Sequence, residues 1–429
     1  MAKPNKKEWL EPKRKEIMEW MSDERRRTGI GRAVNAYTSA KENALKRLPE
    51  LEEMRKEVRA IKERSIAEMD ELTKITMDSV TEVKGIPYLA KDMCQAHSIF
   101  SSIVGEGKLI VKSKSLTSEE ILLNEMLEEN GNKIFETDLG EFIIQLRHEK
   151  PTHVINPSVH VPREEVALTF SKLLGHKVDP DIPGLVNVAR EYLREKFCNA
   201  NIGISGANVV AAKTGTLFII ENEGNARFVS NAPPVHICLT GIEKLVPSLA
   251  DAFKVVQVLP PYATGVLMAA YVSLITGPSK TADIEKTIVY GAHGPKELHV
   301  ILLDNGRSAM AKDPIFREAL YCLRCGGCMY ECPVYQVIGG SFGNNYFGGI
   351  GIIWSAFTRG EATVAAAIDA CTKCGRCKEV CPLEIDTPKM VEHLKQKLAK
   401  KGYIQSQHKK IRESINKNGN PFGIKKGIK

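Results

Sequence analysis

The chain has 429 residues, of which 43% are hydrophobic, and a formal net charge of +8. That length is enough for two or three domains, each with its own core. The start of the chain, MAKPNKKEWLEPKRK, contains no apolar segment of a secretion signal, and the most apolar stretch, residues 266–275, is too short to cross a bilayer. We therefore expect a soluble cytoplasmic protein with no transmembrane segment.

The N-terminal region, residues 1–84, is rich in Glu, Lys and Arg and has apolar residues at helical spacing. This spacing is seen at Leu45, Leu48, Leu51, Met54, Val58 and Ile61. The charged residues fit solvated helix faces with pairs of opposite charge one turn apart. We predict a helical N-terminal region.

Short apolar runs and amphipathic segments alternate in the following part of the chain. The order is LIVKS from Leu109, then SLTSEEILLNEMLEEN, KIFETD, EFIIQL and THVINPS. Thr117 and Glu120 have the spacing of a capping box, which would begin a helix that continues through Leu127. Strands that alternate with helices predict a mostly parallel sheet with helices on both faces. Residues 85–308 are therefore expected to form an α/β domain.

Two segments of this domain, residues 204–241 and 277–307, combine glycine with polar and charged residues. In the first, LFIIE and ARFVS are predicted to be strands joined by a hairpin turn at residues 222–225. Loops of this kind at strand ends are where an open α/β sheet binds its ligand. The sequence contains no G-x-G-x-x-G motif between a strand and a helix, so an integral Rossmann nucleotide site is unsupported, and it contains no P-loop.

Two cysteine runs near the C-terminal end share the pattern C-x2-C-x2-C-x3-C-P. The first run consists of Cys322, Cys325, Cys328 and Cys332, and the second of Cys371, Cys374, Cys377 and Cys381. This is the spacing by which bacterial ferredoxins bind [4Fe–4S] clusters, and in those proteins the fourth cysteine ligates the other cluster. We therefore predict two clusters, one bound by Cys322, Cys325, Cys328 and Cys381, and the other by Cys371, Cys374, Cys377 and Cys332.

Two other uses of these cysteines are less well supported. A pair of zinc sites would be built from C-x2-C pairs and would leave the third and fourth cysteines of each run unexplained. Disulfides are disfavoured because no secretion signal precedes the chain. Three further cysteines, Cys94, Cys198 and Cys238, lie among apolar residues and are predicted to be small buried hydrophobic side chains.

The segment between the two runs is rich in glycine and aromatic residues. Because it has too many glycines for a helix interior, we predict an ordered loop that shields the clusters from water with Phe342, Tyr346, Phe347 and Trp354. A flexible linker is the alternative, although such linkers lack so many aromatic residues. A helical signal around residues 361–370 indicates that helices bracket the cysteine runs. Residues 309–390 are therefore expected to form an all-α ferredoxin-type domain.

Positive charge is concentrated in and after the second cysteine run. Lys373, Arg376 and Lys378 lie within it, and positive charge near a cluster favours the reduced form, so this run is predicted to hold the higher-potential or partner-facing cluster. Residues 389–429 contain twelve Lys or Arg and two Glu. This basic C-terminal tail, residues 391–429, lacks interleaved aromatic residues, so a docking role is favoured over binding of nucleic acid.

Several stretches resemble the signature stretches of the lactate-utilisation (LUD) domain. They are SGANVVAAKTGTLFIIENEGNARFVS, PPVHICLTGIEKLVPSLAD, GPSKTADIE and HGPKELHVILLDNGRS. With KSKSLTSEEILLNE, ETDLGEFIIQL and the double cysteine run, they are similar to the long iron–sulfur subunit of the three-subunit L-lactate utilisation complex. The resemblance implies a LUD domain of the NagB/RpiA/CoA-transferase-like type, followed by a helical ferredoxin domain. It also implies two partner subunits, one an iron–sulfur subunit with cysteine-rich domains and one a second LUD protein.

Oxidation of lactate requires a cation for the carboxylate and a base for the hydroxyl proton. The candidates in the α/β domain are His236, His293, His299, Glu221, Arg227 and Arg307. Each has an ordinary structural explanation, so we assign no catalytic residue and no cofactor-binding residue beyond the eight cluster cysteines. A flavin or a special cluster on a partner would have to separate the two electrons of the reaction.

The leading hypothesis is an electron-transfer subunit of a complex that oxidises L-lactate to pyruvate, and hence part of an oxidoreductase. A second hypothesis places the same redox module in another anaerobic complex, with a heterodisulfide reductase-like or flavin dehydrogenase partner. The ending INKNGNPFGIKKGIK resembles the segment that follows the clusters in heterodisulfide-reductase-like subunits, which leaves the electron partner open. A third hypothesis is a scaffold or nucleic-acid-binding protein with structural clusters.

Overall fold

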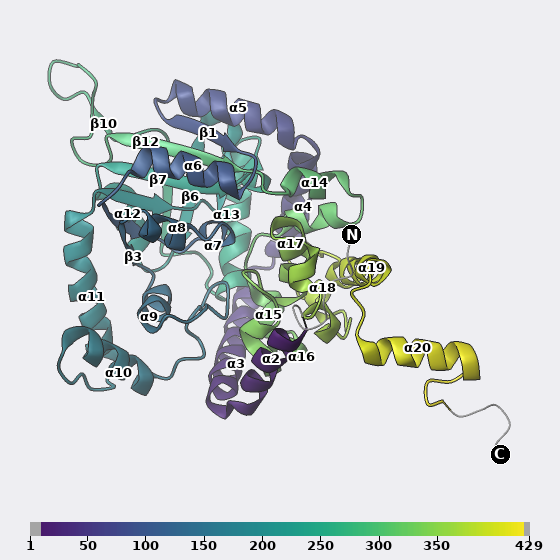
Figure 1. Cartoon of the computed structure of the whole chain (residues 1–429). Coiled ribbons are helices and arrows are strands. Elements are labelled where there is room, and N and C mark those ends of the chain that lie inside the picture. The colour runs from purple at the N-terminus through teal and green to yellow at the C-terminus, as the bar shows by residue number, and fades with distance from the viewer. Residues whose placement is uncertain (1–9, 424–429) are drawn as a thin grey trace.

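The structure of this protein is a computed structural model that describes residues 10–423 (Figure 1). Two predictions concern residues outside this range. They are the absence of a secretion signal at the start of the chain, which rests in part on residues 1–9, and the basic character of the last residues, 424–429. The N-terminal region is helical as predicted. It consists of α2 (Glu11–Ser22), α3 (Glu24–Arg47), α4 (Leu51–Ala67) and α5 (Met69–Glu82).

The following region contains a six-stranded sheet in which every neighbouring pair of strands is parallel. Its strands are β1 (Ile86–Ala90), β2 (Leu109–Lys112), β3 (Lys133–Glu136), β4 (Ile202–Ser205), β7 (Val235–Gly241) and β12 (Glu297–Leu303), in the spatial order β1-β12-β7-β4-β2-β3. The connections after β2 and after β3 run in opposite directions across the sheet. This order creates a topological switch point between β2 and β4, where open α/β sheets bind their ligands.

Both faces of this sheet are covered, as the sequence predicted. On one face Ile237 and Ile301 pack with Phe100 of α6 and Leu127 of α8. The opposite face enters a larger core that also includes residues of α4, α13 and a second sheet. The helices of the α/β region are α6 (Met93–Val104), α7 (Leu116–Glu120), α8 (Leu123–Glu129), α9 (Leu139–Arg147), α10 (Arg163–Leu174), α11 (Ile182–Asn199), α12 (Asn225–Asn231) and α13 (Leu249–Ala263), with 3-10 turns η1 (Ala212–Thr214) and η2 (Ile242–Lys244).

A second, four-stranded sheet has the order β8-β5-β6-β9. It consists of β5 (Val209–Ala211), β6 (Thr216–Glu221), β8 (Leu245–Val246) and β9 (Tyr271–Ile275). A separate two-stranded hairpin, β10 (Lys280–Thr281) and β11 (Val289–Tyr290), projects from the body of the molecule (Figure 1). Neither the second sheet nor this projection was predicted from the sequence.

The hairpin predicted around residues 222–225 is wrong in its second half. LFIIE lies in β6, but ARFVS belongs to the helix α12. The carboxylate of Glu221 accepts hydrogen bonds from the backbone N–H groups of Ala226 (2.7 Å) and Arg227 (2.8 Å), which satisfies free donors at the start of that helix. Ala226 and Val229, three residues apart, are both buried, so the segment has a helical rather than an alternating pattern of burial.

The predicted capping box at Thr117 and Glu120 is also wrong. The helix begins at Leu116 without a side-chain cap, and it is interrupted after α7 because Leu122 has a left-handed backbone, with φ of 52°. The carboxylate of Glu120 is bound to Arg307 instead of to the start of the helix. A distant ion pair therefore replaces the local capping interaction that the sequence suggested.

The C-terminal region is helical and continues the same core. Its elements are α14 (Arg307–Lys312), η3 (Phe316–Tyr321), α15 (Gly327–Tyr330), α16 (Pro333–Ile338), η4 (Gly339–Ser341), α17 (Gly348–Thr358), η5 (Glu361–Val364), η6 (Ile368–Ala370), α18 (Arg376–Glu379), α19 (Thr387–Lys400) and α20 (Ser406–Asn418). The predicted loop between the cysteine runs is in part the helix α17, although it contains Gly349 and Gly351. Adding a Cβ atom at Gly351 would bring it against the backbone of Tyr346, so close packing explains the glycine.

The N-terminal helices join the α/β region to the C-terminal helices. The hydroxyl of Tyr37 on α3 donates to the carbonyl oxygen of Tyr262 on α13 (2.8 Å), and the Tyr37 ring packs on Tyr330 of α15 with centroids 4.8 Å apart. Arg59 on α4 forms an ion pair with Glu318 of η3 (2.7 Å). One continuous hydrophobic core includes residues of all three regions.

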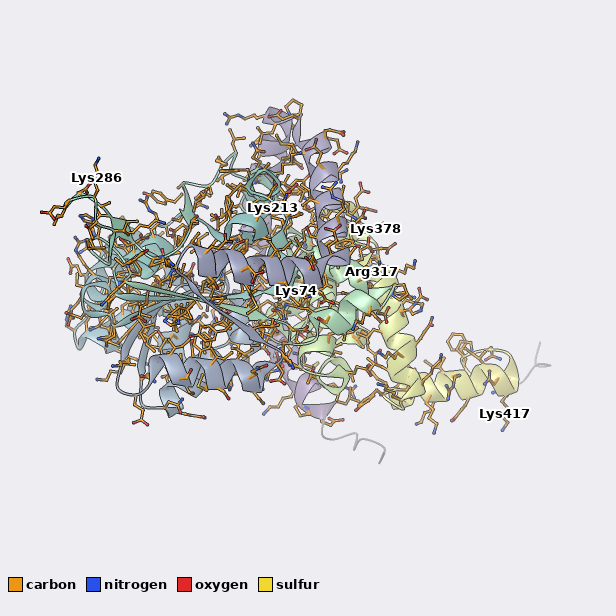
Figure 2. All side chains as sticks on the ribbon, turned by 90° about the horizontal axis from the view of Figure 1, so that it is seen from above. Lys74, Lys213, Lys286, Arg317, Lys378 and Lys417 are labelled. Atoms are coloured by element: carbon orange, nitrogen blue, oxygen red, sulfur yellow. The ribbon has the colours of Figure 1, made fainter. Side chains whose placement is uncertain are left out.

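The basic C-terminal segment is not a uniform tail. Its first part is α19, which packs on α17 and buries Val391 and Leu394, whereas α20 extends away from the body (Figures 1 and 2). Within residues 10–423 no helix combines the length and the apolar character needed to span a membrane. The prediction that the three other cysteines are buried holds for Cys238 and is wrong for Cys94 and Cys198, which are exposed.

Candidate iron–sulfur centres and an adjacent pocket

The two cysteine runs have the same local backbone. In each run the residue before the second cysteine is left-handed, with φ of 64° at Arg324 and 57° at Lys373. The residue after that cysteine is a left-handed glycine, with φ of 76° at Gly326 and 88° at Gly375. These turns place the third cysteine of each run on a short helix, α15 or α18, and the repeated sequence pattern is therefore a repeated structure.

Glycine is required at Gly326 for a second reason. A Cβ atom there would lie 2.8 Å from Val154 and 2.9 Å from the ring of His153. His153 is buried, its ring stacks on Tyr330 at 4.1 Å, and burial lowers its pKa to about 3, so the ring is neutral. The α/β region thus packs directly on the turn of the first cysteine run.

The last cysteine of each run lies beside the first three cysteines of the other run. Burial raises the pKa of Cys325 to about 12, and of the neighbouring thiols Cys381 contributes most. Burial likewise raises the pKa of Cys377 to about 12, with Cys332 as the strongest neighbouring thiol. This is the neighbourhood that the predicted exchange of fourth ligands requires.

The four cysteines predicted to bind the first cluster border an apolar cavity, together with Cys377 of the second run. Cys322, Cys325, Cys328, Cys377 and Cys381 line it together with Val154, Met329, Tyr346, Phe347, Ile350, Trp354 and Leu383. Three of the four aromatic residues predicted to shield the clusters are therefore at the cavity, and the fourth, Phe342, is buried without lining it. In the second cysteine run Cys374 is exposed, and the helix α18 has no buried residue. The second run therefore lies nearer the surface than the first.

The donor set fits iron–sulfur clusters. Buried thiols with a pKa near 12 stay protonated at neutral pH unless a metal replaces the proton, and thiolates are the usual cluster ligands. In residues 10–423 no three or more His, Cys, Asp or Glu side chains are grouped as they would be around a single metal ion. If clusters are bound, each thiolate would be held by a different iron, so the four ligands of a cluster would not need to meet at one ion.

The cations of the second run are each paired with an acidic side chain. Lys373 pairs with Glu392 (3.3 Å), Arg376 with Glu331 (2.8 Å) and Lys378 with Asp386 (2.7 Å), and all three cations are about half exposed. These pairs offset much of the positive charge that the sequence analysis assigned to this cluster. The higher-potential or partner-facing position of this cluster remains a prediction.

A buried ion network lies beside the first group of cysteines. The Arg307 guanidinium, with a side chain that is 0% exposed, donates two hydrogen bonds of 2.9 Å to the carboxylate of Glu120 and a further bond to Glu243. Arg324, between Cys322 and Cys325, also pairs with Glu243 (3.3 Å) and stacks on Trp354 at 3.9 Å. Burial alone would raise the pKa of Glu243, but Arg307 and Arg324 lower it to about 2.

A second cavity, of about 320 Å³, opens at the carboxyl ends of β2, β3 and β4. Its lining includes Ser113, Lys114 and Ser115 after β2, Asp138 after β3, and Gly206, Ala207 and Asn208 after β4, with Glu221, Glu223 and Lys244 nearby. This is the topological switch point of the parallel sheet. Val154, Leu323 and Arg324 line both this pocket and the apolar cavity of the first cysteine group.

Of the six catalytic candidates, only Glu221 lines this pocket. His236 is buried against Ser205 (2.7 Å), and burial lowers its pKa to about 3. His299 is bonded to Tyr88 and Glu297, and His293 is exposed. Arg227 does not close a hairpin but lies over the ring of Tyr271 at 4.7 Å. Arg307 belongs to the buried ion network.

The pocket cations Lys114 and Lys244 were not among the residues predicted from the sequence. Lys244 donates to the carbonyl oxygen of Ala207 (2.8 Å), and burial lowers its pKa to about 8. One local signal was available for Lys114, because it lies in the polar run KSKS, which begins with the last residue of the strand β2. In a parallel sheet this is the position of ligand-binding residues.

An α/β domain that shares its core with a helical domain carrying two ferredoxin-type cysteine runs is the architecture of an iron–sulfur protein. Residues 73–303 match the LUD domain, and residues 318–385 match the 4Fe–4S dicluster domain. The chain belongs to the LUD-domain family, and within it to the proteins with a C-terminal 4Fe–4S dicluster domain. The resemblance found in the sequence is thereby confirmed.

Similar proteins cover most of the chain. "Lactate utilization protein B" of Bacillus subtilis (strain 168) is 33% identical over 389 residues, which are 90% of this chain and 79% of that protein. The "Uncharacterized electron transport protein YkgF" of Escherichia coli (strain K12) is 31% identical over 390 residues, 90% and 80% of the two chains. A crystal structure of a DUF162 family protein from Deinococcus radiodurans aligns with 55% of this chain and 98% of its own at 13% identity, with a TM-score of 0.28, too low to support an inference.

Proposed function

We propose that this protein is the iron–sulfur electron-transfer subunit of a multisubunit complex that oxidises L-lactate to pyruvate. The observation that carries this proposal is the close packing of two cysteine runs of ferredoxin spacing against the LUD domain. Two relatives support it by name, one as a lactate utilization protein and one as an electron transport protein. The partners would be the other subunits of such a complex, in the cytoplasm.

We propose the following ligand sets for the two [4Fe–4S] clusters. One set is Cys322, Cys325, Cys328 and Cys381, and the other is Cys371, Cys374, Cys377 and Cys332. The thiol neighbourhoods of Cys325 and Cys377 support this exchange of fourth ligands. When bound, each cluster supplies one-electron redox chemistry.

The chain's own residues would set up a path for electrons. The first ligand set borders the apolar cavity. This cavity and the pocket at the end of the parallel sheet share three lining residues, Val154, Leu323 and Arg324. The second set, with the exposed Cys374, lies nearer the surface. Oxidation of a 2-hydroxy acid to a 2-oxo acid releases two electrons and two protons, so a flavin or another cluster on a partner is proposed to separate the electron pair.

Two finer features of the fold are also proposed. The parallel sheet with helices on both faces supports a LUD domain of the NagB/RpiA/CoA-transferase-like type. The division of the chain into residues 1–84, 85–308, 309–390 and 391–429 remains a prediction. Because α19 (Thr387–Lys400) runs across the last of these boundaries, we propose that the helical domain extends to the end of α19.

The metal content tests this proposal. Protein purified without oxygen should be brown, contain about eight iron atoms per chain and be reversibly reduced by dithionite, because two cubanes hold four iron atoms each. Metal analysis and visible spectroscopy measure this. Stoichiometric zinc without iron would contradict the redox function, and clusters that cannot be reduced would favour the scaffold hypothesis.

The exposed second group predicts where electrons leave the chain. Replacing Lys378, Lys400 and Lys401 with Glu should slow electron delivery to an acidic partner and flatten its salt dependence, while the iron content stays unchanged. Long-range attraction between exposed charges is screened as the Debye length falls from about 10 Å at 0.1 M salt to about 3 Å at 1 M. Stopped-flow reduction of the co-purifying partner at several salt concentrations measures the effect.

A matched control carries the same change of charge elsewhere. Lys280, Lys286 and Lys296 are exposed in and beside the projecting hairpin, with Lys286 at its tip, on the far side of the molecule from Lys378 (Figure 2). Replacing these three with Glu should leave the rate unchanged. Equal slowing by both triple variants would show that only net charge matters, and a parental rate in the first variant at low salt would place the docking surface elsewhere.

A further inference from the structure

The pocket at the switch point of the parallel sheet contains buried hydrogen-bond donors without partners. Among the described residues, Nζ of Lys114 and Nε and Nη1 of Arg324 are buried and make no hydrogen bond. Lys114 forms an ion pair with Glu141 at 3.9 Å, a separation too long for a hydrogen bond, so Oε1 of Glu141 also lacks one. A buried donor atom that makes no hydrogen bond is costly, so these three nitrogen atoms are expected to face an acceptor supplied by a ligand.

The acidic side chains of the same pocket are already engaged. Glu221 accepts from the backbone N–H groups of Ala226 and Arg227, and Asp138 accepts from the N–H of Glu141 (3.0 Å) at the start of α9. Glu223 accepts from the N–H of Leu139 (3.4 Å). The carboxylates therefore already accept hydrogen bonds, whereas Nζ of Lys114 and Nε and Nη1 of Arg324 donate none. Arg324 pairs with Glu243 through its other terminal nitrogen only. This asymmetry in unused donors favours a negatively charged ligand over a cation.

The dimensions of the pocket favour a small ligand. Its volume of about 320 Å³ is close to the lower end of the range of roughly 300–1,000 Å³ that is typical of small-molecule sites. Lys244 adds a third cation to the lining and uses one of its donors on the carbonyl oxygen of Ala207. A compact acid can meet these donors without filling the larger space that a dinucleotide needs.

We propose that this pocket binds the carboxylate of a small 2-hydroxy or 2-oxo acid, with Lys114 and Arg324 as its charged hydrogen-bond donors. The anion site follows from the cavity and the unpaired donors, and the choice of a hydroxy or oxo acid rests on the proposed function. Arg324 lies between Cys322 and Cys325, and its backbone N–H is 3.4 Å from Sγ of Cys322. A bound acid would thus be in contact with a residue of the first cysteine run.

Calorimetric titration of the anaerobically purified, iron-loaded full chain tests the site. L-lactate or pyruvate should bind with one site per chain, and lactamide, which lacks the charge, should not. Lys114→Gln should weaken binding about tenfold to a hundredfold, because a hydrogen bond to a charged group contributes roughly 1.5–3 kcal/mol. Lys114→Arg, which keeps the charge, should retain most of the affinity.

Lys133→Gln is the matched control. Lys133 is exposed at the amino end of β3, whereas the pocket lies at the carboxyl ends of the strands, so its loss should leave the affinity unchanged. If Lys114→Gln loses its iron, the comparison of L-lactate with lactamide on the parental chain still decides the question. The proposal is overturned if neither acid binds, if Lys114→Gln binds them with parental affinity, or if inorganic phosphate binds equally well.

The same samples separate this proposal from the proposed function. Iron content and reduction by dithionite are measured beside the titration. Reducible clusters without binding of either acid would refute the pocket and leave the electron-transfer function standing. Binding of an acid by a chain whose clusters cannot be reduced would support the pocket and refute that function.

Discussion

Replacing Arg307 with Met is expected to destabilise the protein by about 3–5 kcal/mol, because it leaves the buried carboxylate of Glu120 without its counter-charge and removes one of the two arginines paired with Glu243. Glu120 and Glu243 are at most 1% exposed, and both depend on the same guanidinium. The remaining partners of Glu120 are neutral: the hydroxyl of Tyr346 and the amide of Asn305. Glu243 would keep Arg324 at 3.3 Å. The loss should therefore be centred on Glu120.

Chemical denaturation under anaerobic conditions measures this effect. Arg163, whose side chain is 60% exposed and paired with Glu164, is the control, and Arg163→Met should cost no more than about 1 kcal/mol. Adding Glu120→Gln to Arg307→Met should restore part of the stability by removing the unpaired charge. A loss below about 1 kcal/mol in Arg307→Met would show that water reaches the network.

Features that depend on short-range patterns could be predicted from the sequence. The strand β12 is an example. Its residues from Leu298 to Leu303 are apolar except for one histidine, and such a continuous run is typical of a parallel strand that is buried on both faces. The cysteine spacing is another such pattern, because the ligands of a cluster recur within a dozen residues, and the two runs do have matching turns around Gly326 and Gly375.

Predictions failed where distant contacts override local preference. ARFVS has the composition of a strand, yet the carboxylate of Glu221 caps it as a helix. The glycines of α17 argued against a helix, but tight packing against Tyr346 requires one of them. The strand β8 has only two residues, which is too short for a recognisable alternating pattern. In each case the secondary structure depends on contacts that the local sequence pattern does not reveal.

The pocket could not be assembled from sequence for a similar reason. Lys114, Lys244 and Arg324 are far apart in the chain and meet only because parallel strands end at one edge of the sheet and the helical domain packs there. The helical pattern of the N-terminal region showed which side of each helix is apolar. It did not show that α3 would bridge the α/β domain and the cysteine-bearing helices, as Tyr37 does.

The exchange of fourth cysteines between the runs is the feature on which the electron-transfer account depends. With exchanged ligands, Cys322 and Cys381 serve one cluster, and Cys332 serves the other. If each run instead bound its own cluster, Cys322 and Cys332 would share a cluster, and Cys381 would belong to the second. The two arrangements make opposite predictions for a matched pair of double variants. Both variants remove Cys322, and each also removes the fourth cysteine of one run, either Cys381 or Cys332.

The iron content of these double variants is the most direct test. Cys322→Ala with Cys381→Ala should retain about four iron atoms per chain, because one cluster keeps all its ligands, whereas Cys322→Ala with Cys332→Ala should lose nearly all of the about eight. Far-ultraviolet circular dichroism would verify that both variants remain folded. If the first pair loses both clusters while the second retains about four iron atoms, the runs bind separate clusters and the interleaved electron-transfer module described above is contradicted.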